Sequence, residues 1–168
     1  MDNVPLILTL TLDDESQQYF NSLRRAHFPP ERNYLDAHLT LFHNLPASET
    51  QIISDIELAT ASYTPMDLQV TGVKSIGNGV AFHLECSLLK QLHSYLQQLW
   101  QVWLISQDKQ KLWPHITVQN KVTPDVAMLL KAQLEKDFEP FVIHGKGLAL
   151  YEYHGGPWKF VRDSKFSG

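Results

Sequence analysis

The chain of 168 residues has a single cysteine, Cys86, and no apolar run long enough to span a membrane. One cysteine cannot form an internal disulfide, which fits the reducing cytosol. Residues 1–5 also lack the basic start and apolar block of a secretory signal peptide. We therefore expect a cytoplasmic protein that does not contact membranes.

Excess positive charge is also missing. The chain has 14 Lys and Arg against 18 Asp and Glu, for a formal net charge of −4. Proteins that coat long nucleic acids need many cationic contacts to phosphates, so the composition argues against that class. It leaves open a nucleotide or a short oligonucleotide in a local pocket. The nine Pro and eight Gly form no low-complexity tract, which fits an ordinary globular domain.

One short motif occurs twice. Residues 38–41 and 115–118 both read His, aliphatic, Thr, aliphatic, in stretches rich in β-branched and apolar residues that predict strands. Because strand side chains alternate between faces, the His and the Thr of each motif are expected on one face and the aliphatic residues on the other. An imidazole and a hydroxyl placed in this way can bind one small anion. Two such pairs that face each other can hold a phosphate from both sides.

The two motifs fall within a longer internal repeat. Their separation is 115 − 38 = 77 residues, close to half of the chain. At this offset the apolar segment 6–10 aligns with 83–87, and the helix-like segment 13–25 aligns with 90–102. The halves share a pattern more than they share residues, and we interpret the pattern as a duplication.

Hydrophobic periodicity predicts the elements. Strands are predicted at 6–12, 37–44, 66–76, 80–86, 113–122, 141–153 and 158–162, and helices at 13–27, 47–61, 87–104 and 123–137. The order β-α-β-α-β-β-α-β-α-β-β predicts an α+β fold with two pseudo-symmetric lobes, whose antiparallel sheets flank a central groove. We expect one bilobal domain over residues 1–168, with lobes at about 1–78 and 79–168.

With their flanks, the motifs resemble the two-histidine (2H) phosphoesterase superfamily, and most closely its bacterial 2′-5′ RNA ligase-like branch. The resemblance is carried by residues 38–46 and 113–122, and by the tail at 148–151 and 155–158. Such proteins act on 2′,3′-cyclic phosphates or 2′-5′-linked nucleotides in a groove between two lobes. Better-studied ligase-like members tend to have an Arg-bearing segment ahead of the first motif, and the nearest match here is 32–35.

The resemblance implies that His38 and His115 are the catalytic acid–base pair, and that Thr40 and Thr117 bind the phosphate oxygens. Side-chain chemistry agrees, because the ordinary pKa of His is near 6.5 and both protonation states coexist near neutrality. The pseudo-symmetry leaves open which His is the acid. Without a carboxylate or a third His nearby, we expect no metal and no cofactor.

Four further residues are candidates for substrate binding. Strand alternation places Phe42 and Gln119 next along the two inward faces, where Phe42 can stack on a base and Gln119 can bond a phosphate or a base edge. Phe42 is equally well explained as a core residue. Tyr151 and Trp158, near the last hairpin, are candidates for a stacking wall, with buried packing as the alternative for Trp158.

The other histidines are expected to play no part in the site. His43 directly follows Phe42 and is expected to face away from His38. Four more have no partner at ligand spacing and are expected to be structural or exposed: His83, His93, His144 and His154.

The leading hypothesis is a monomeric, metal-independent phosphodiesterase. Its substrates would be nucleotides or short RNA ends with a 2′,3′-cyclic phosphate or a 2′-5′ linkage, with reversible 2′-5′ ligation as a further capacity. The alternative is a non-catalytic binder of small phosphorylated nucleotides that uses the same side chains. Retention of both His and both Thr favours catalysis, since binding alone can use Lys, Arg or backbone amides.

Overall fold

A computed structural model describes residues 4–167. The elements are β1 (Pro5–Leu12), α1 (Asp14–His27), η1 (Pro30–Arg32), β2 (Leu39–Pro46), α2 (Thr50–Ser62), β3 (Met66–Ser75), β4 (Val80–Glu85), α3 (Ser87–Trp100), η2 (Ser106–Lys109), β5 (His115–Gln119), α4 (Pro124–Lys136), β6 (Phe141–Tyr153) and β7 (Trp158–Lys165). Residues 1–3 of the stretch without a signal-peptide pattern lie outside this range. Within residues 4–167, no helix combines the length and apolar character that a membrane crossing requires.

Local sequence signals explain where the helices begin and end. Asp13 caps α1, because its carboxylate accepts bonds from the backbone N–H and the hydroxyl of Ser16 at 3.1 and 2.6 Å. Phe28 ends α1 in an extended conformation, as expected of a residue that precedes proline. The helix predicted at 87–104 stops at Trp100, and η2 follows it.

The strands form one sheet of seven strands with antiparallel pairing, which confirms the predicted α+β class. The order is β2-β1-β6-β3-β4-β5, and β7 pairs with β6. The long strand β6 joins two parts, since its first residues pair with β3 and its later residues pair with β7. Each part contains strands from both halves of the chain. The division into lobes at about 1–78 and 79–168 stays a prediction.

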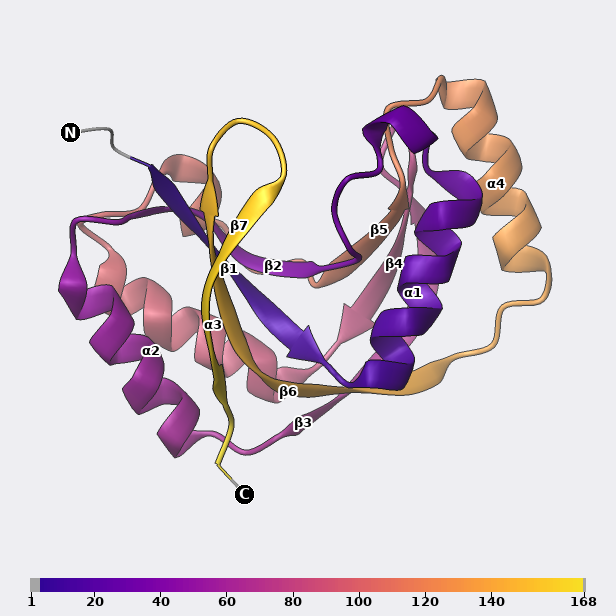
Figure 1. Cartoon of the computed structure of the whole chain (residues 1–168). Coiled ribbons are helices and arrows are strands. Elements are labelled where there is room, and N and C mark those ends of the chain that lie inside the picture. The colour runs from indigo at the N-terminus through magenta and orange to yellow at the C-terminus, as the bar shows by residue number, and fades with distance from the viewer. Residues whose placement is uncertain (1–3, 168) are drawn as a thin grey trace.

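Each side of the molecule also has one helix from each half of the chain. Figure 1 shows α2 and α3 on one side of the molecule and α1 and α4 on the other. Arg24 of α1 donates to the backbone oxygen of Thr117 in β5 at 3.1 Å. A ring nitrogen of His93 in α3 lies 3.0 Å from the backbone oxygen of Leu41 in β2. A helix from each half therefore supports the motif strand of the other half.

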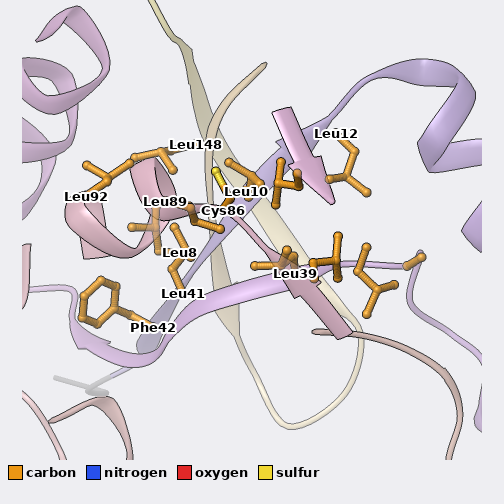
Figure 2. Close-up of a cluster of buried hydrophobic side chains, with 14 of the residues drawn as sticks. Leu8, Leu10, Leu12, Leu39, Leu41, Phe42, Cys86, Leu89, Leu92 and Leu148 are labelled. Atoms are coloured by element: carbon orange, nitrogen blue, oxygen red, sulfur yellow. The ribbon is translucent and has the colours of Figure 1, made fainter. Parts of the chain in front are cut away.

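A continuous hydrophobic core fixes the sheet relative to these helices. Figure 2 shows part of it, where Leu8 of β1 lies with Leu41 and Phe42 of β2 against Leu89 and Leu92 of α3. Burial of several such side chains is worth about 1.5–3 kcal/mol for each one. The strands that carry the motifs are thereby held on a rigid base.

The two motif strands meet although they lie at opposite ends of the strand order. β2 and β5 contact one another directly. A flat sheet of this order would keep them apart, because β1, β6, β3 and β4 lie between them. The sheet is therefore strongly curved, and its curvature brings the motifs together.

Candidate active site

The histidine of each motif is held in the same way. His38 directly precedes β2 and His115 is the first residue of β5. Nδ1 of His38 lies 2.8 Å from the backbone oxygen of Asp36, and Nδ1 of His115 lies 2.8 Å from the backbone oxygen of Trp113. Because a carbonyl oxygen only accepts, the proton is on Nδ1 in both rings. Nε2 of each neutral ring therefore carries no proton and can accept one.

Each ring also packs against a tryptophan. The rings of His38 and Trp158 have centroids 4.5 Å apart, and those of His115 and Trp113 have centroids 4.4 Å apart. A carbonyl bond and an aromatic contact together restrict the orientation of each imidazole. The same two contacts, one with a backbone carbonyl and one with a tryptophan ring, therefore hold both imidazoles in a fixed orientation.

Burial lowers the pKa of His38 to about 4, with further lowering by the positive charges of Arg24, His115 and His43. The hydrogen bond to the backbone oxygen of Asp36 acts in the opposite direction. Since the charge of one imidazole changes the pKa of the other, the two motif histidines are electrostatic neighbours.

The pKa of His115 is lowered in the same direction. Burial is the largest cause, the bond to Trp113 opposes it, and the positive charges of His43 and His83 add to it. With both pKa values below the ordinary 6.5, both rings are mainly neutral at pH 7 in the free protein.

The threonines lie where the alternation predicts. Thr40 pairs with Thr9 across β1 and β2, and Thr117 pairs with Ala81 across β4 and β5. Both side chains are partly exposed on the faces that carry the histidines. Within residues 4–167 neither hydroxyl has a hydrogen-bond partner in the protein, so both are able to donate to a bound anion.

A β-bulge follows each motif. In β2 the register passes from the pair Thr9–Thr40 to the pair Leu8–Phe42, which leaves Leu41 as an extra residue. In β5 it passes from Ala81–Thr117 to Val80–Gln119, which leaves Val118 as an extra residue. An extra residue reverses the alternation, so the side chain after each bulge turns to the opposite face.

The bulges correct the expected positions of Phe42 and Gln119. Phe42 is fully buried, its ring stacks on His93 with centroids 4.7 Å apart, and it contacts Trp100. The core alternative for Phe42 is therefore the one that the structure shows (Figure 2). Gln119 is 4% exposed, and among the described residues its Oε1 has no hydrogen-bond partner. Neither side chain is presented to a substrate.

The same reversal brings His43 to the site, and the expectation that it faces away from His38 is wrong. His43 follows Phe42, which now points into the core, so the ring of His43 emerges on the face of His38 and Thr40. Its Nδ1 lies 3.0 Å from Oδ1 of Asp108 in η2. Regular alternation gives no signal for this placement.

Arg24 is a second residue that the motifs do not reveal. It is 4% exposed, its Nε donates to Oδ1 of Asn33 at 3.1 Å, and its guanidinium lies 4.2 Å from the ring of Phe28. Burial lowers its pKa, while the nearby Asp36 raises it. A sequence signal does exist, since Arg24 lies four residues after the buried Phe20 on the inward stripe of α1.

A cavity of about 410 Å³ opens beside His38. The loop after α1 contributes Tyr34 and Asp36 to its wall, and β6 and β7 contribute Tyr151 and Trp158. Figure 1 shows the two backbone segments that contribute these residues, the β6–β7 hairpin and the loop after α1. The structure therefore brings Tyr151 and Trp158 together with His38, while His115 lies outside the cavity lining.

The cavity carries aromatic and acidic character. The rings of Tyr151 and Trp158 have centroids 5.6 Å apart. Burial raises the pKa of Tyr151, and the carboxylates of Asp36 and Asp163 raise it further. Among residues 4–167, no cluster of three or more His, Cys, Asp or Glu is arranged to hold a metal ion.

Solved structures share this fold over nearly the full chain. Escherichia coli LigT complexed with 3′-AMP superposes with a TM-score of 0.59 at 16% identity, covering 99% of this chain and 100% of LigT. The protein TT0787 of Thermus thermophilus gives a TM-score of 0.63 at 15% identity, covering 98% of each chain. No curated protein matches the sequence significantly.

The structural similarities, at 15–16% identity, show the fold, whereas a comparison of the sequence with protein-family models identifies the family. The model of the 2′-5′ RNA ligase superfamily matches residues 12–157, which include both motifs, the loop after α1 and the start of the last hairpin. That match covers most of the chain. The chain therefore belongs to the 2′-5′ RNA ligase superfamily, among the two-histidine phosphoesterases.

Proposed function

We propose that the protein is a metal-independent phosphodiesterase that acts on 2′,3′-cyclic phosphates or 2′-5′-linked nucleotides. One observation carries the proposal. His38 and His115 have the same tautomer, each has Nε2 directed away from its carbonyl partner, and their strands β2 and β5 contact one another. Two imidazoles so arranged supply one base and one acid to a single phosphate.

The reaction follows from these groups. A water oxygen attacks phosphorus while Nε2 of one imidazole takes its proton. The bond between phosphorus and the leaving ribose oxygen breaks, and that oxygen receives a proton from Nε2 of the other imidazole. Thr40 and Thr117 donate to the non-bridging oxygens and keep the phosphorus between the rings. With a ribose 5′-hydroxyl in place of water, the same proton transfers join its oxygen to the phosphorus of a 2′,3′-cyclic phosphate, while the bond from phosphorus to the 3′ oxygen breaks and leaves a 2′-5′ linkage.

The acid must acquire a proton although both rings favour the neutral form. A phosphodiester is an anion, and an anion next to an imidazole raises the pKa of that imidazole. Substrate binding therefore favours the protonation that the leaving group needs. Burial of the rings, which lowers both pKa values, keeps the other ring neutral and able to act as the base.

The cavity beside His38 supports a nucleotide as the substrate. Tyr151 and Trp158 present aromatic surface next to the catalytic ring, and stacking of a base on such surface is worth about 1–3 kcal/mol. Structures of LigT with 3′-AMP, NADP⁺ and ATP show that a protein of the same fold binds nucleotides. We place the reaction in the cytoplasm, on nucleotides or short RNA ends, and in a monomer.

A panel of 2′,3′-cyclic nucleotides and 2′-5′ dinucleotides tests the proposal. Wild-type protein should release product with or without a chelator. His38→Ala and His115→Ala should each lose about 10²–10⁴-fold in rate. His144→Ala is a matched control, because His144 is an exposed residue paired with Asp67 away from the site.

Substitution of Trp158, which lines the cavity, tests whether the nucleobase binds there. Trp158→Ala should raise KM about tenfold for nucleotide substrates, because it removes stacking surface. A non-catalytic binder would instead show binding without product, unchanged by either histidine substitution. A rate that a chelator abolishes and Mn²⁺ or Zn²⁺ restores would overturn the metal-independent chemistry.

A further inference from the structure

A second bulge in β2 places His43 and Asn44 out of the regular ladder. The pairs Leu8–Phe42 and Leu6–Leu45 leave one residue too many between them on β2. The backbone N–H groups of His43 and Asn44 turn to the carboxylate of Asp108 at distances of 2.8–3.0 Å. The carboxylate of Asp108 in η2 therefore accepts the hydrogen bonds that a neighbouring strand would otherwise accept.

The same carboxylate orients the ring of His43. Burial alone would raise the pKa of Asp108, but the bonds from the ring and backbone of His43 and from Asn44 outweigh it and leave that pKa lowered. Asp108 is thus ionised and acts only as an acceptor, which puts a proton on Nδ1 of His43. Nε2 faces away from Asp108, and the side chain of His43 is 42% exposed.

The ring lies within electrostatic reach of the proposed catalytic pair. A positive charge on His43 lowers the pKa values of both His38 and His115. The titratable groups around His43 are these two rings, His93 of α3 and the carboxylate of Asp108. Asp108 is the group of opposite charge among them, and it balances a cation at His43.

A structural role accounts for Nδ1 of His43, which donates to Asp108, but not for Nε2, which faces away from that carboxylate. The backbone bonds to Asp108 require no particular side chain at position 43. His43 nevertheless presents an oriented, exposed ring on the face of His38 and Thr40, at the far end of β2 from the cavity that contains Trp158. A base in that cavity and a phosphate between the motifs would direct the rest of a nucleotide chain toward this ring.

We propose that His43, oriented by Asp108, binds a second phosphate of the substrate, next to the phosphate held between His38 and His115. This inference rests on the proposed function and specifies its substrate class: nucleotides that carry another phosphate besides the reacting one. As an imidazolium, His43 donates from Nε2 to a phosphate oxygen, while Asp108 keeps the ring in place.

Two substrates that differ by one phosphate give the test. The first is a 2′,3′-cyclic mononucleotide and the second is the same compound with a 5′-phosphate. Wild-type kcat/KM should be about tenfold higher for the second, and His43→Gln should bring the ratio close to one. His43→Lys, which restores a cation, should recover part of the preference. His144→Gln should keep the wild-type ratio.

A third substrate identifies the source of the phosphate. In a dinucleotide with the same cyclic end, the second phosphate is internucleotide rather than terminal. A larger gain with the dinucleotide assigns the site to a continuing chain, and a larger gain with the 5′-phosphate assigns it to a chain end. Added salt should reduce either gain, because it screens the attraction between the imidazolium and the phosphate.

These measurements separate a failure of the proposed function from a failure of the second phosphate site. Wild-type protein that turns over neither substrate contradicts the proposed function itself. Turnover with the same ratio in wild type and His43→Gln leaves the proposed function intact and overturns the second phosphate site. An equal loss on both substrates in His43→Gln also overturns it, since that result assigns His43 to the reacting phosphate.

Discussion

Leu41 and Val118 are 118 − 41 = 77 residues apart, and each is the extra residue of a β-bulge directly after a His-x-Thr motif. The offset is the same as that between His38 and His115. The two motifs therefore share a backbone irregularity as well as a residue pattern. Bulges bend a strand and redirect its side chains, which suits strands that must turn toward each other at a site.

Gly79 supports the bulge of β5, and its substitution tests the importance of that contact. A Cβ at Gly79 would lie 1.9 Å from the backbone oxygen of Gln119. Gly79→Ala should displace the end of β5, destabilise the protein by about 2 kcal/mol or more, and lower kcat. Urea unfolding and steady-state kinetics measure both effects. Gly156→Ala, whose Cβ meets nothing within 4 Å, should change stability by less than about 0.5 kcal/mol.

The pH dependence of kcat/KM should have its maximum on the acidic side of 6.5. In the proposed reaction the rate requires one neutral and one protonated imidazole, so it rises through the lower pKa and falls through the higher one. The pKa of His38 is about 4, and that of His115 is also below 6.5. Either assignment of acid and base gives the same curve. A maximum above pH 7 on a cyclic mononucleotide would contradict the prediction.

His38 should also make the fold sensitive to acid. Its pKa is about 4 in the folded protein and near 6.5 in the unfolded chain, so the unfolded chain binds the proton first as pH falls. Stability is therefore lost between pH 6.5 and 4, by roughly 2–3 kcal/mol from this group. His38→Gln should gain about that much relative to wild type on going from pH 8 to pH 4. Unfolding free energies at the two pH values measure the gain.

Arg24 should contribute to the stability of the fold. It joins α1 to the second motif strand through the backbone oxygen of Thr117 and to the loop through Asn33. Arg24→Met keeps much of the volume but leaves both acceptors without this donor, and it should cost about 2–4 kcal/mol. Arg25→Met, at an exposed neighbouring position, is the control. Equal unfolding midpoints for the two variants would show that the buried bonds contribute little.

The pattern of elements is accessible from the sequence because it depends on local periodicity. The predicted strand 141–153 has the bounds that the structure shows, and the other elements differ from their predicted bounds by a few residues at one or both ends. The predicted third helix is too long, because it extends to residue 104. The chain turns after Trp100, and Gln97 then bonds the backbone oxygens of Asp108 and Gln110 to hold η2. That turn is what carries Asp108 to β2.

The sequence by itself determined the α+β class, the repeated motif and the four side chains that the motif contains, since spacing of two residues on a strand is a local property. The tertiary structure alone decided which residues beyond the motifs face the site. One extra residue in each motif strand sends Phe42 and Gln119 inward, and in β2 it brings His43 outward. The position of a bulge depends on pairing with β1 or β4, far away in sequence, and local alternation cannot show it.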